Sequence, residues 1–498
     1  MATVSALVDK YTSPRAKRIM RYAAYVAGTQ YDGREPFLSQ RADAPPILER
    51  APCVVYPIVD IAIASYLDFC LGEGRFPTFA TEDESSQHEA IELVTKQTKF
   101  HTRMRRAFRT ALSCGSACAI VGIRNGRLFI SVEDPAHCTP TINEDDVCEQ
   151  LEICYPFVEE YFDGREKTYK KRVMLFRRVI DATHDTVFEP VEAPSFDLDI
   201  TWTERERVAH GLGFCPVVWY RTLTTGTAID GHPLHENICD EIDAMNFSLS
   251  QRYRASLYSG DPQIIEIGVD REESAGGTGR TASVTTENGW FSVRTSGTPA
   301  RRKGPGTVWT YERPDAKVEM LTLGADALRA IDDNARDLKA KISEALAFVD
   351  IDIESAKIAG DASGKALEIL FRRHTDRCDT YRSDFGDGFI VPVMSMLLAI
   401  MGVAVDCLDL VWGPYFKPTV ADYKSDIELC QAAISAGLMT KKMAVERLKS
   451  RGLLSGDVSE LIAENESEDE PEPVSEMPED REVRAGDGLG HEDDSGMS

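Results

Sequence analysis

The chain has 498 residues, of which 43% are hydrophobic, and its formal net charge is −26. This length accommodates roughly two to four domains with buried cores. The acidic balance excludes a nonspecific nucleic-acid coat, which needs dense lysine and arginine, but it allows a surface along which DNA slides without sticking. Residues Glu464–Ser498 carry 14 acidic side chains against two arginines, and this composition predicts a disordered acidic tail.

The first part of the chain, residues 1–225, is expected to be an α+β domain with an antiparallel sheet. Helical spacing of apolar residues predicts helices at Arg15–Ala27, Val59–Leu71 and His88–Leu112. From Ala119 the pattern changes to short strands. Asn125-Gly126, between two apolar runs, is the strongest two-residue hairpin signal in the chain.

Twelve cysteines are scattered along the chain, and none forms a CxxC pair. This spacing does not favour a zinc site, and cysteine is expected to serve as a small core residue in a reducing compartment. Cys114 and Cys118 lie in a small-residue run, Ala111–Ala119, that is expected to be helical. That spacing places both on one helix face, where they favour close packing over metal binding.

Two helix-patterned segments flank a strand-and-loop insert in the middle of the chain. The first helix has apolar residues three or four apart at Leu234, Ile238, Ile242, Met245, Leu249, Tyr253 and Leu257. The second repeats this spacing at Leu328, Ile331, Ala335, Leu338, Ile342 and Leu346. The insert contains a basic cluster without acidic residues: Arg294, Arg301, Arg302 and Lys303. This cluster is interpreted either as a contact for phosphates or an acidic partner, or as a solvated basic loop.

A polar loop, Phe348–Gly364, follows the second helix. Its charged and capping residues are Asp350, Asp352, Glu354, Lys357, Asp361 and Ser363. The acidic spacing misses the EF-hand pattern, so a solvated acidic loop is preferred to a metal site. Lys365–Ile400 is expected to be a long helix that kinks at Gly386, Gly388 and Pro392.

The last predicted elements are a short strand at Leu408–Trp412 and two small helices at Asp422–Ala436 and Thr440–Arg451. The apolar run Phe389–Val405 is shorter than the roughly 20 residues of a membrane span and contains proline, so a buried helix is expected. The N-terminus has no apolar signal-peptide core. A soluble intracellular protein is therefore predicted.

Catalytic motifs are missing from the sequence. It contains no GxxxxGK[ST], HExxH or GxSxG, and no GxGxxG that opens a helix after a strand. Gly276-Gly277-Thr278-Gly279 lies in a low-complexity stretch and is interpreted as a linker rather than a phosphate loop. We therefore expect no catalytic residues, no metal, no cofactor and no enzyme activity.

The order of these elements resembles the portal proteins of tailed bacteriophages. Four segments carry the resemblance: Ala111–Pro135 (ALSCGSACAIVGIRNGRLFISVEDP), Gly213–Tyr220 with Asp240–Ser250 (DEIDAMNFSLS), Gly360–Leu370 (GDASGKALEIL) and Trp412–Leu448. Together they span nearly all of residues 15–455. The departure from the family pattern is the long, polar and partly basic insert.

The resemblance implies a portal fold with these parts: residues 1–233 the wing, 234–259 and 325–347 the two stem helices, 260–324 the clip, 348–364 the tunnel loop, 365–402 the kinked wing helix, 403–463 the crown and 464–498 the acidic tail. It assigns the loop residues above to the DNA channel and the basic cluster to clip docking or phosphate contact.

The resemblance also implies the function and partners. A homo-oligomeric ring, of 12 subunits in the family, passes double-stranded DNA during packaging and ejection and docks terminase and head-completion or adaptor proteins. Capsid and scaffold proteins are further expected partners, and no membrane is. The expected location is the portal vertex of the virion, after assembly in the host cytoplasm. The alternatives are another minor capsid or tail-adaptor protein of a phage, or a cytosolic nucleic-acid enzyme.

Overall fold

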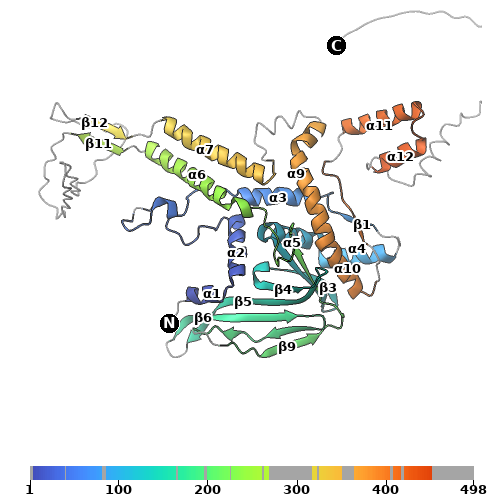
Figure 1. Cartoon of the computed structure of the whole chain (residues 1–498), viewed down its shortest axis with the longest axis horizontal. Helices are drawn as coiled ribbons and strands as arrows, with labels where there is room; N and C mark the ends of the chain where they lie inside the picture. Colours follow the sequence, from blue (N-terminus) through green and yellow to red (C-terminus); the bar gives the residue numbers. More distant parts are fainter. Residues whose placement is uncertain are drawn as a thin grey trace, which may run out of the picture. The chain divides into compact units, whose positions relative to one another are not determined.

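The computed structural model describes residues 4–39, 41–80, 86–163, 167–195, 199–224, 226–260, 263–267, 317–321, 325–349, 364–403, 408–416 and 420–450 (Figure 1). Contacts within the chain divide it into two units, Met1–Tyr415 and Phe416–Ser498. The first unit mixes helices with antiparallel sheets, as the predicted α+β class requires.

The N-terminal helices of the first unit are α1 (Val4–Tyr11), α2 (Pro14–Ala27), α3 (Ile58–Leu71), α4 (Ser86–Thr98) and α5 (Phe100–Cys114), with a short 3-10 turn at Ile47–Glu49. Helix α2 begins where the Ser13 hydroxyl accepts a hydrogen bond from the Ala16 amide, and it ends at Gly28 with φ 73°. The three helices expected here therefore exist, although His88–Leu112 is two helices and not one.

The expectation that Cys114 and Cys118 share a helix face is wrong. Helix α5 ends at Cys114, because Gly115 adopts φ 85° and lies so close to Gly231 that a Cβ would stand 2.3 Å from the Gly231 carbonyl oxygen. Cys118 belongs to the next strand, β2 (Ser116–Arg124). The run of small residues Ala111–Ala119 therefore contains both the end of helix α5 and the start of strand β2.

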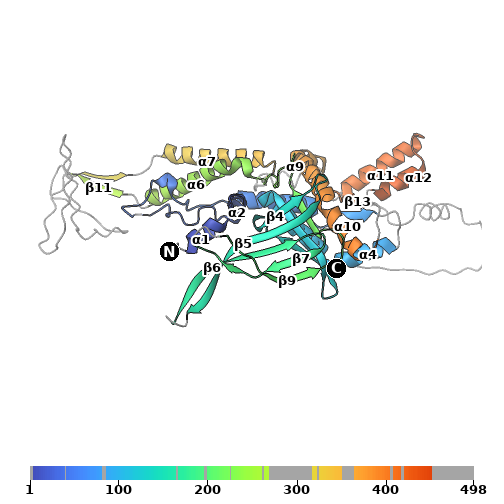
Figure 2. The ribbon, with the colours of Figure 1, turned by 60° about the horizontal axis from the view of Figure 1, so that its bottom comes forward.

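Two antiparallel sheets follow (Figure 2). The three-stranded sheet has the order β10 (Val217–Arg221), β2, β3 (Arg127–Glu133), and the β2–β3 turn is Asn125-Gly126 with φ 53° and 73°, as predicted. The six-stranded sheet contains β4 (Cys138–Ile142), β5 (Cys148–Asp163), β6 (Thr168–Ile180), β7 (His184–Phe188) and β9 (Glu204–Ala209) in that order, and β8 (Val191–Glu192) pairs with β6.

The two long helices expected in the middle of the chain are α6 (Cys239–Gly260), preceded by a 3-10 turn at Glu236–Ile238, and α7 (Ala325–Ala345). They lie side by side (Figure 1). Between them in sequence, β11 (Gln263–Ile267) and β12 (Lys317–Leu321) pair antiparallel, with Gln263 opposite Leu321. The structure therefore contains the expected order of helix, paired strands and helix.

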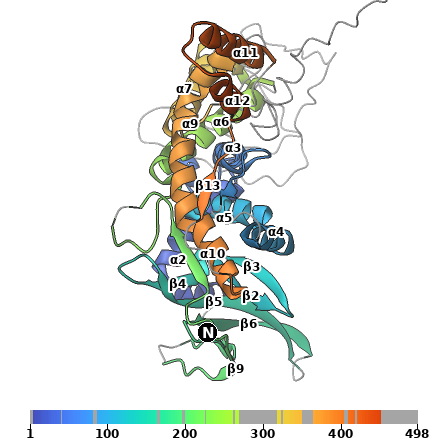
Figure 3. The ribbon, with the colours of Figure 1, turned by 90° about the vertical axis from the view of Figure 1, so that its right-hand side faces the viewer.

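The last helical run of the first unit is α9 (Gly364–Phe385) followed by α10 (Val391–Ile400) (Figure 3). A π-helical turn, Gly386–Ile390, separates them at the place where a kink was predicted. Strand β13 (Asp409–Val411) then pairs with β1 (Thr78–Ala80), which joins the end of this unit to its N-terminal part. The main core is built from α3, α4, α5, α6, α7, α9 and α10 together with β2, β3 and β10.

Within the second unit the structure describes Phe416 and residues 420–450. Helices α11 (Val420–Ser435) and α12 (Lys441–Ser450) contact each other across a turn at Gly437 with φ 70°. Leu438 is 82% exposed at that turn. The expected helical pair is present, and the predicted acidic tail lies outside the described residues.

Candidate functional site

The residues predicted from the sequence to contact DNA or partners lie outside the described part of the chain. This holds for the loop residues Asp350, Asp352, Glu354, Lys357, Asp361 and Ser363, and for the basic cluster Arg294, Arg301, Arg302 and Lys303. The predictions for both groups stay predictions. The structure does describe the helices from which these two segments depart, and their geometry forms the candidate site.

Helix α6 has a buried polar stripe that the sequence reading missed. Asn246 and Ser250 are both fully buried. The Asn246 side-chain oxygen accepts a hydrogen bond from the Tyr56 amide at 2.9 Å, and the Ser250 hydroxyl accepts one from the Val54 amide at 3.0 Å. Backbone amides of a loop that packs against a helix have no strand or helix partner, and these two side chains supply the hydrogen-bond acceptors that they need. The loop before α3 is thereby fixed to α6.

Asp243, half-buried and three residues before Asn246 on the same side of α6, binds two tyrosine hydroxyls. Tyr31 donates to it at 2.6 Å and Tyr25 at 2.9 Å. Burial, together with this hydrogen bond to a carboxylate, raises the pKa of Tyr25 to about 12. Residues 243, 246 and 250 are three and four positions apart, which places their side chains on one face of the helix. This spacing is the feature of the sequence from which the shared polar face could have been predicted.

The apolar stripe of α6 changes from buried to exposed along the helix. Ile242 and Met245 are 1% exposed, whereas Tyr253 and Leu257 are 47% and 45% exposed. The prediction that these residues form one apolar stripe is right in spacing, but only the first half faces the core of this chain. The outer half of α6 leaves two large apolar side chains at the surface.

Polar contacts hold α6 against α7. Arg252 and Asp332 form an ion pair at 2.6 Å, and the Asn334 amide donates to the Ser248 hydroxyl at 2.8 Å. Asp332 also binds Arg336 one turn along α7. The two helices are therefore joined by an ion pair and a hydrogen bond as well as by packing.

The C-terminal end of α7, where the predicted tunnel loop begins, is capped by three side chains from other helices. The Tyr66 hydroxyl donates to the Leu346 carbonyl at 2.7 Å, the His374 Nδ1–H to the Ala347 carbonyl at 3.1 Å, and Arg377 to the Ala345 carbonyl at 3.2 Å. These carbonyls have no partner within the helix. The start of the loop is thus anchored to α3 and α9.

Ala347 itself has φ 50°, which is uncommon for a residue with a side chain. It is nevertheless buried, and the following residue, Phe348, is 7% exposed and belongs to the main core. Packing and capping together hold the backbone in this conformation. The chain leaves α7 in a fixed direction before the segment that the structure does not describe.

The π-helical turn after α9 is packed against two aromatic residues. A Cβ on Gly386 would lie 3.0 Å from the Trp412 ring, and one on Gly388 would lie 3.2 Å from the Tyr220 ring. Arg382, 6% exposed, stacks on the Tyr415 ring at 3.8 Å and donates to the Gly413 and Phe69 carbonyls. The two glycines allow the aromatic rings to lie against the π-helical turn. Arg382 of α9 contacts Gly413 and Tyr415, and so fixes the segment after β13 to this helix.

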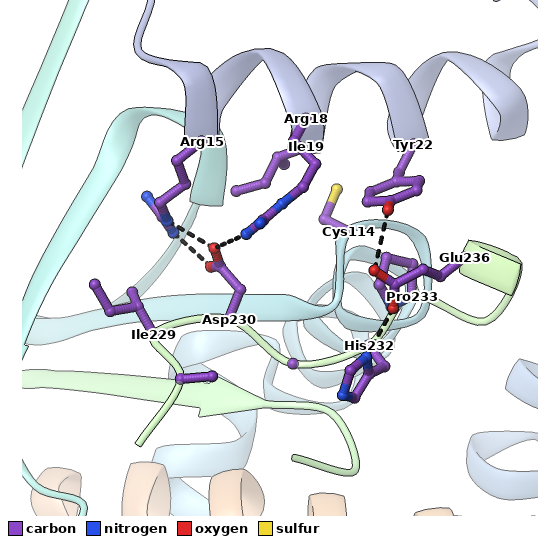
Figure 4. Close-up of a pocket in the computed structure, with 12 residues that line it drawn as sticks. Arg15, Arg18, Ile19, Tyr22, Cys114, Ile229, Asp230, His232, Pro233 and Glu236 are labelled. Atoms are coloured by element: carbon purple, nitrogen blue, oxygen red, sulfur yellow. Dashed lines mark hydrogen bonds and ion pairs between the residues drawn. The ribbon is translucent and has the colours of Figure 1, made fainter. Parts of the chain in front are cut away.

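A cavity of about 350 Å³ lies between α2 and the segment that leads into α6 (Figure 4). Asp230, whose side chain is 6% exposed, binds Arg15 with two hydrogen bonds of 2.7 and 2.6 Å and Arg18 with one of 3.1 Å. On the other side, Glu236 accepts hydrogen bonds from Tyr22 at 3.0 Å and His232 at 2.7 Å. The charged groups satisfy one another, which favours a structural role.

The contacts of the candidate site anchor helices and loops to one another. Among the described residues no group of three or more histidine, cysteine, aspartate or glutamate side chains is arranged to hold a metal ion. The basic face of α5 is paired with α3, since Arg105 binds Asp68 and Arg109 binds Asp60. The described site therefore consists of helix ends, caps and packed glycines.

One helical run, Glu368–Ile400, is long and apolar enough for a membrane span by length and composition. Its apolar part is packed inside this unit, because Phe389, Val393, Met394 and Leu397 are all fully buried. These side chains belong to the main core. A buried helix, as predicted for this run, accounts for the same composition.

No family model matches the chain, and no curated protein matches it. Among solved structures, a chain of the "Virion of native gene transfer agent (GTA) particle" is similar to it, with a TM-score of 0.42 and 10% sequence identity over 90% of this chain and 95% of that chain. A likeness of this size shows neither a family nor a function.

Proposed function

We propose that the chain is the portal subunit of a tailed bacteriophage, a ring-forming channel for DNA at one vertex of the capsid. The observation that carries the proposal is the pair of helices α6 and α7 with strands β11 and β12 between them in sequence. The inner ends of both helices are embedded in the core, and the outer half of α6 exposes apolar residues.

The exposed half of α6 is the surface that a neighbouring subunit would cover. Tyr253 and Leu257 are one helical turn apart and both exposed. A single exposed apolar residue is common on protein surfaces and needs no partner. Tyr253 and Leu257, however, lie next to each other and continue the buried apolar stripe of α6, so together they form a small apolar surface. In a ring, the same patch on every subunit meets a second, different patch on the next one, and the contact closes by rotation.

In this proposal the chain does no chemistry. Terminase hydrolyses ATP, and the portal ring supplies the channel, the docking surface for terminase and adaptor proteins, and the attachment to capsid and scaffold proteins. Residues 350–363 are proposed to meet passing DNA, and the basic cluster is proposed to meet phosphates or an acidic partner. The anchored end of α7 supports this proposal, because it fixes where the loop begins.

Negative-stain electron microscopy of the purified chain tests the proposal. We expect rings with a central hole, and we expect the double variant Tyr253→Asp with Leu257→Asp to remain monomeric at concentrations where the unchanged chain is fully assembled, because a buried unpaired carboxylate is costly. Ile123→Asp, on an exposed residue of the β2–β3 hairpin, serves as the control and should leave rings intact. Monomers or fibres from the unchanged chain would favour a minor capsid or tail-adaptor protein instead.

A second experiment tests the loop. Deleting Gly360–Ser363 is expected to leave rings intact and to impair the packaging or retention of DNA, because the side chains that cap the end of α7 are Tyr66, His374 and Arg377 and remain in the shortened chain. Ring assembly is measured by electron microscopy and DNA content by nuclease protection. Loss of rings on deletion would contradict the assignment of this segment to the channel.

A further inference from the structure

The outer ends of β5 and β6 form a two-stranded arm that extends beyond the rest of the six-stranded sheet (Figure 2). We call residues 158–163 of β5 and 168–172 of β6 the arm. Strand β4 pairs with β5 only as far as Ile153, and β8 pairs with β6 only at Met174 and Leu175. Within the described part of the chain, no third strand pairs with the arm. An open strand edge is a template for a strand of another chain.

One face of the arm is apolar and only its inner end is covered. Val173 and Leu175, at the base of the arm, are buried and pack against α1. Because residues two apart on a strand share a face, this face continues to Val158, Phe162 and Tyr169, which are 45%, 56% and 77% exposed. The rings of Phe162 and Tyr169 contact each other edge-on, with centroids 5.4 Å apart. The arm therefore ends in an exposed aromatic pair.

The two strands of the arm carry charges of opposite sign. Strand β5 has the acidic residues Glu159, Glu160 and Asp163, and β6 has the basic residues Lys170, Lys171 and Arg172. Each acidic side chain forms an ion pair with a basic one across the arm, at 2.7, 3.0 and 2.8 Å. These pairs stabilise the arm, but they would form equally well if acidic and basic residues alternated along each strand. The separation of charge by strand has a further consequence, which is one acidic edge and one basic edge.

We propose that the arm docks on the arm of a second copy of this chain, with the β6 edge of one copy beside the β5 edge of the next. Charged residues often protect a strand edge from pairing, but this protection requires like charges on the edges that meet. Here the β6 and β5 edges attract each other, whereas two β5 edges or two β6 edges repel. The contact is therefore head-to-tail, and it rests on the proposed ring, in which each subunit has two different neighbours.

The strand directions fit this contact. When the arms of neighbouring copies point the same way, β6 of one copy and β5 of the next run antiparallel, as β5 and β6 do within each arm. Repeating the register of the arm between copies places Lys171 opposite Glu160 of the next copy and brings the exposed aromatic pairs into one stripe. The contact uses residues 168–171 of β6, because Arg172 lies beside β8, 3.8 Å from the Glu192 carboxylate.

Two single-cysteine chains test the contact. Chains with Glu160→Cys and with Lys171→Cys are produced together in one cell, and both also carry Cys53→Ser and Cys154→Ser to remove exposed cysteines. After mild oxidation we expect a disulfide-linked pair of chains on a non-reducing gel and, by mass spectrometry, a peptide that joins positions 160 and 171. Either chain produced alone should give no linked pair, because neither position meets its own copy in a head-to-tail contact.

Exchanging charges tests the role of the two edges in a folded arm. A chain with Glu160→Lys, Asp163→Lys, Lys170→Asp and Lys171→Glu keeps the ion pairs within the arm but reverses both edges. It should assemble with itself. When produced with a tagged unchanged chain, it should be captured several-fold less than a control chain with Glu92→Lys and Lys96→Glu, which exchanges an exposed ion pair on α4. Equal capture of the two chains would overturn the role of the edges.

Electron microscopy of the same preparations separates this inference from the portal proposal. Rings without a link between positions 160 and 171 overturn the arm contact and leave the portal proposal intact. A link in filaments or other open assemblies supports the arm contact and contradicts the portal proposal, and monomers without a link contradict both. A linked pair from the Glu160→Cys chain alone would show two β5 edges in contact and would overturn the head-to-tail order.

Discussion

Replacing Asp230 with alanine is expected to lower the free energy of unfolding by about 3 kcal/mol, because it breaks a buried ion pair and leaves Arg15 without a counter-charge. Asp230 joins α2 to the segment that enters α6 by binding Arg15 and Arg18 at once (Figure 4). It also accepts a hydrogen bond from the Ser116 hydroxyl at 3.1 Å. Urea denaturation followed by circular dichroism measures the change.

Two variants calibrate this result. Asp230→Asn keeps the side-chain volume and one acceptor oxygen, and it should destabilise the chain less than Asp230→Ala. Asp9→Ala removes the partner of Lys17 in an exposed ion pair of 2.8 Å, and it should change the free energy of unfolding by less than about 0.5 kcal/mol. Equal effects of Asp230→Ala and Asp9→Ala would show that the buried pair does not anchor α2.

Lowering the pH from 7 to 4 is expected to remove about 3 kcal/mol of stability through His235 alone. This side chain is fully buried next to the rings of Tyr22 and Tyr25, and burial lowers its pKa from 6.5 to about 4. Its Nε2–H donates to the Tyr22 carbonyl at 3.1 Å, while Nδ1 has no hydrogen-bond partner. The neutral ring is the form that fits.

The sign of the effect is fixed by the lowered pKa. Between pH 6.5 and 4 the unfolded chain binds a proton at His235 that the folded chain does not, so stability is fully present above pH 6.5 and falls as the pH drops toward 4. The position of His235 at the start of the turn before α6 adds to the cost, since a helix N-terminus disfavours a cation.

His235→Gln isolates this contribution from the carboxylates that titrate in the same range. Glutamine keeps a donor near the place of Nε2–H but does not ionise. Urea denaturation of both chains at several pH values should give curves that converge as the pH falls from 6.5 to 4. Parallel curves over this range would contradict the buried neutral histidine.

Local signals in the sequence predicted the elements well where one short motif decides the backbone. Asn125-Gly126 predicted a hairpin because both residues tolerate the positive φ that its turn requires. The glycines at 386 and 388 predicted the irregular turn between α9 and α10. The three-and-four spacing predicted α6 and α7, and the turn at Gly437 separated the last two helices.

Burial was harder to predict from the same patterns. Tyr253 and Leu257 continue the apolar spacing of α6, yet they are 47% and 45% exposed, although α7 contacts the same part of the helix through Arg252. Asn246 and Ser250 look like surface residues in the sequence and are fully buried. Their burial depends on loop amides that arrive from about 190 positions earlier in the chain.

By itself, the sequence determined the α+β class, the order of helix, paired strands and helix, and the interruption before α10, since each depends on backbone preferences of neighbouring residues. Only the tertiary structure decided which residues share a site: the caps on the end of α7 and the two arginines on Asp230. These groups are far apart in the chain, and no local periodicity records the packing that brings them within hydrogen-bond distance.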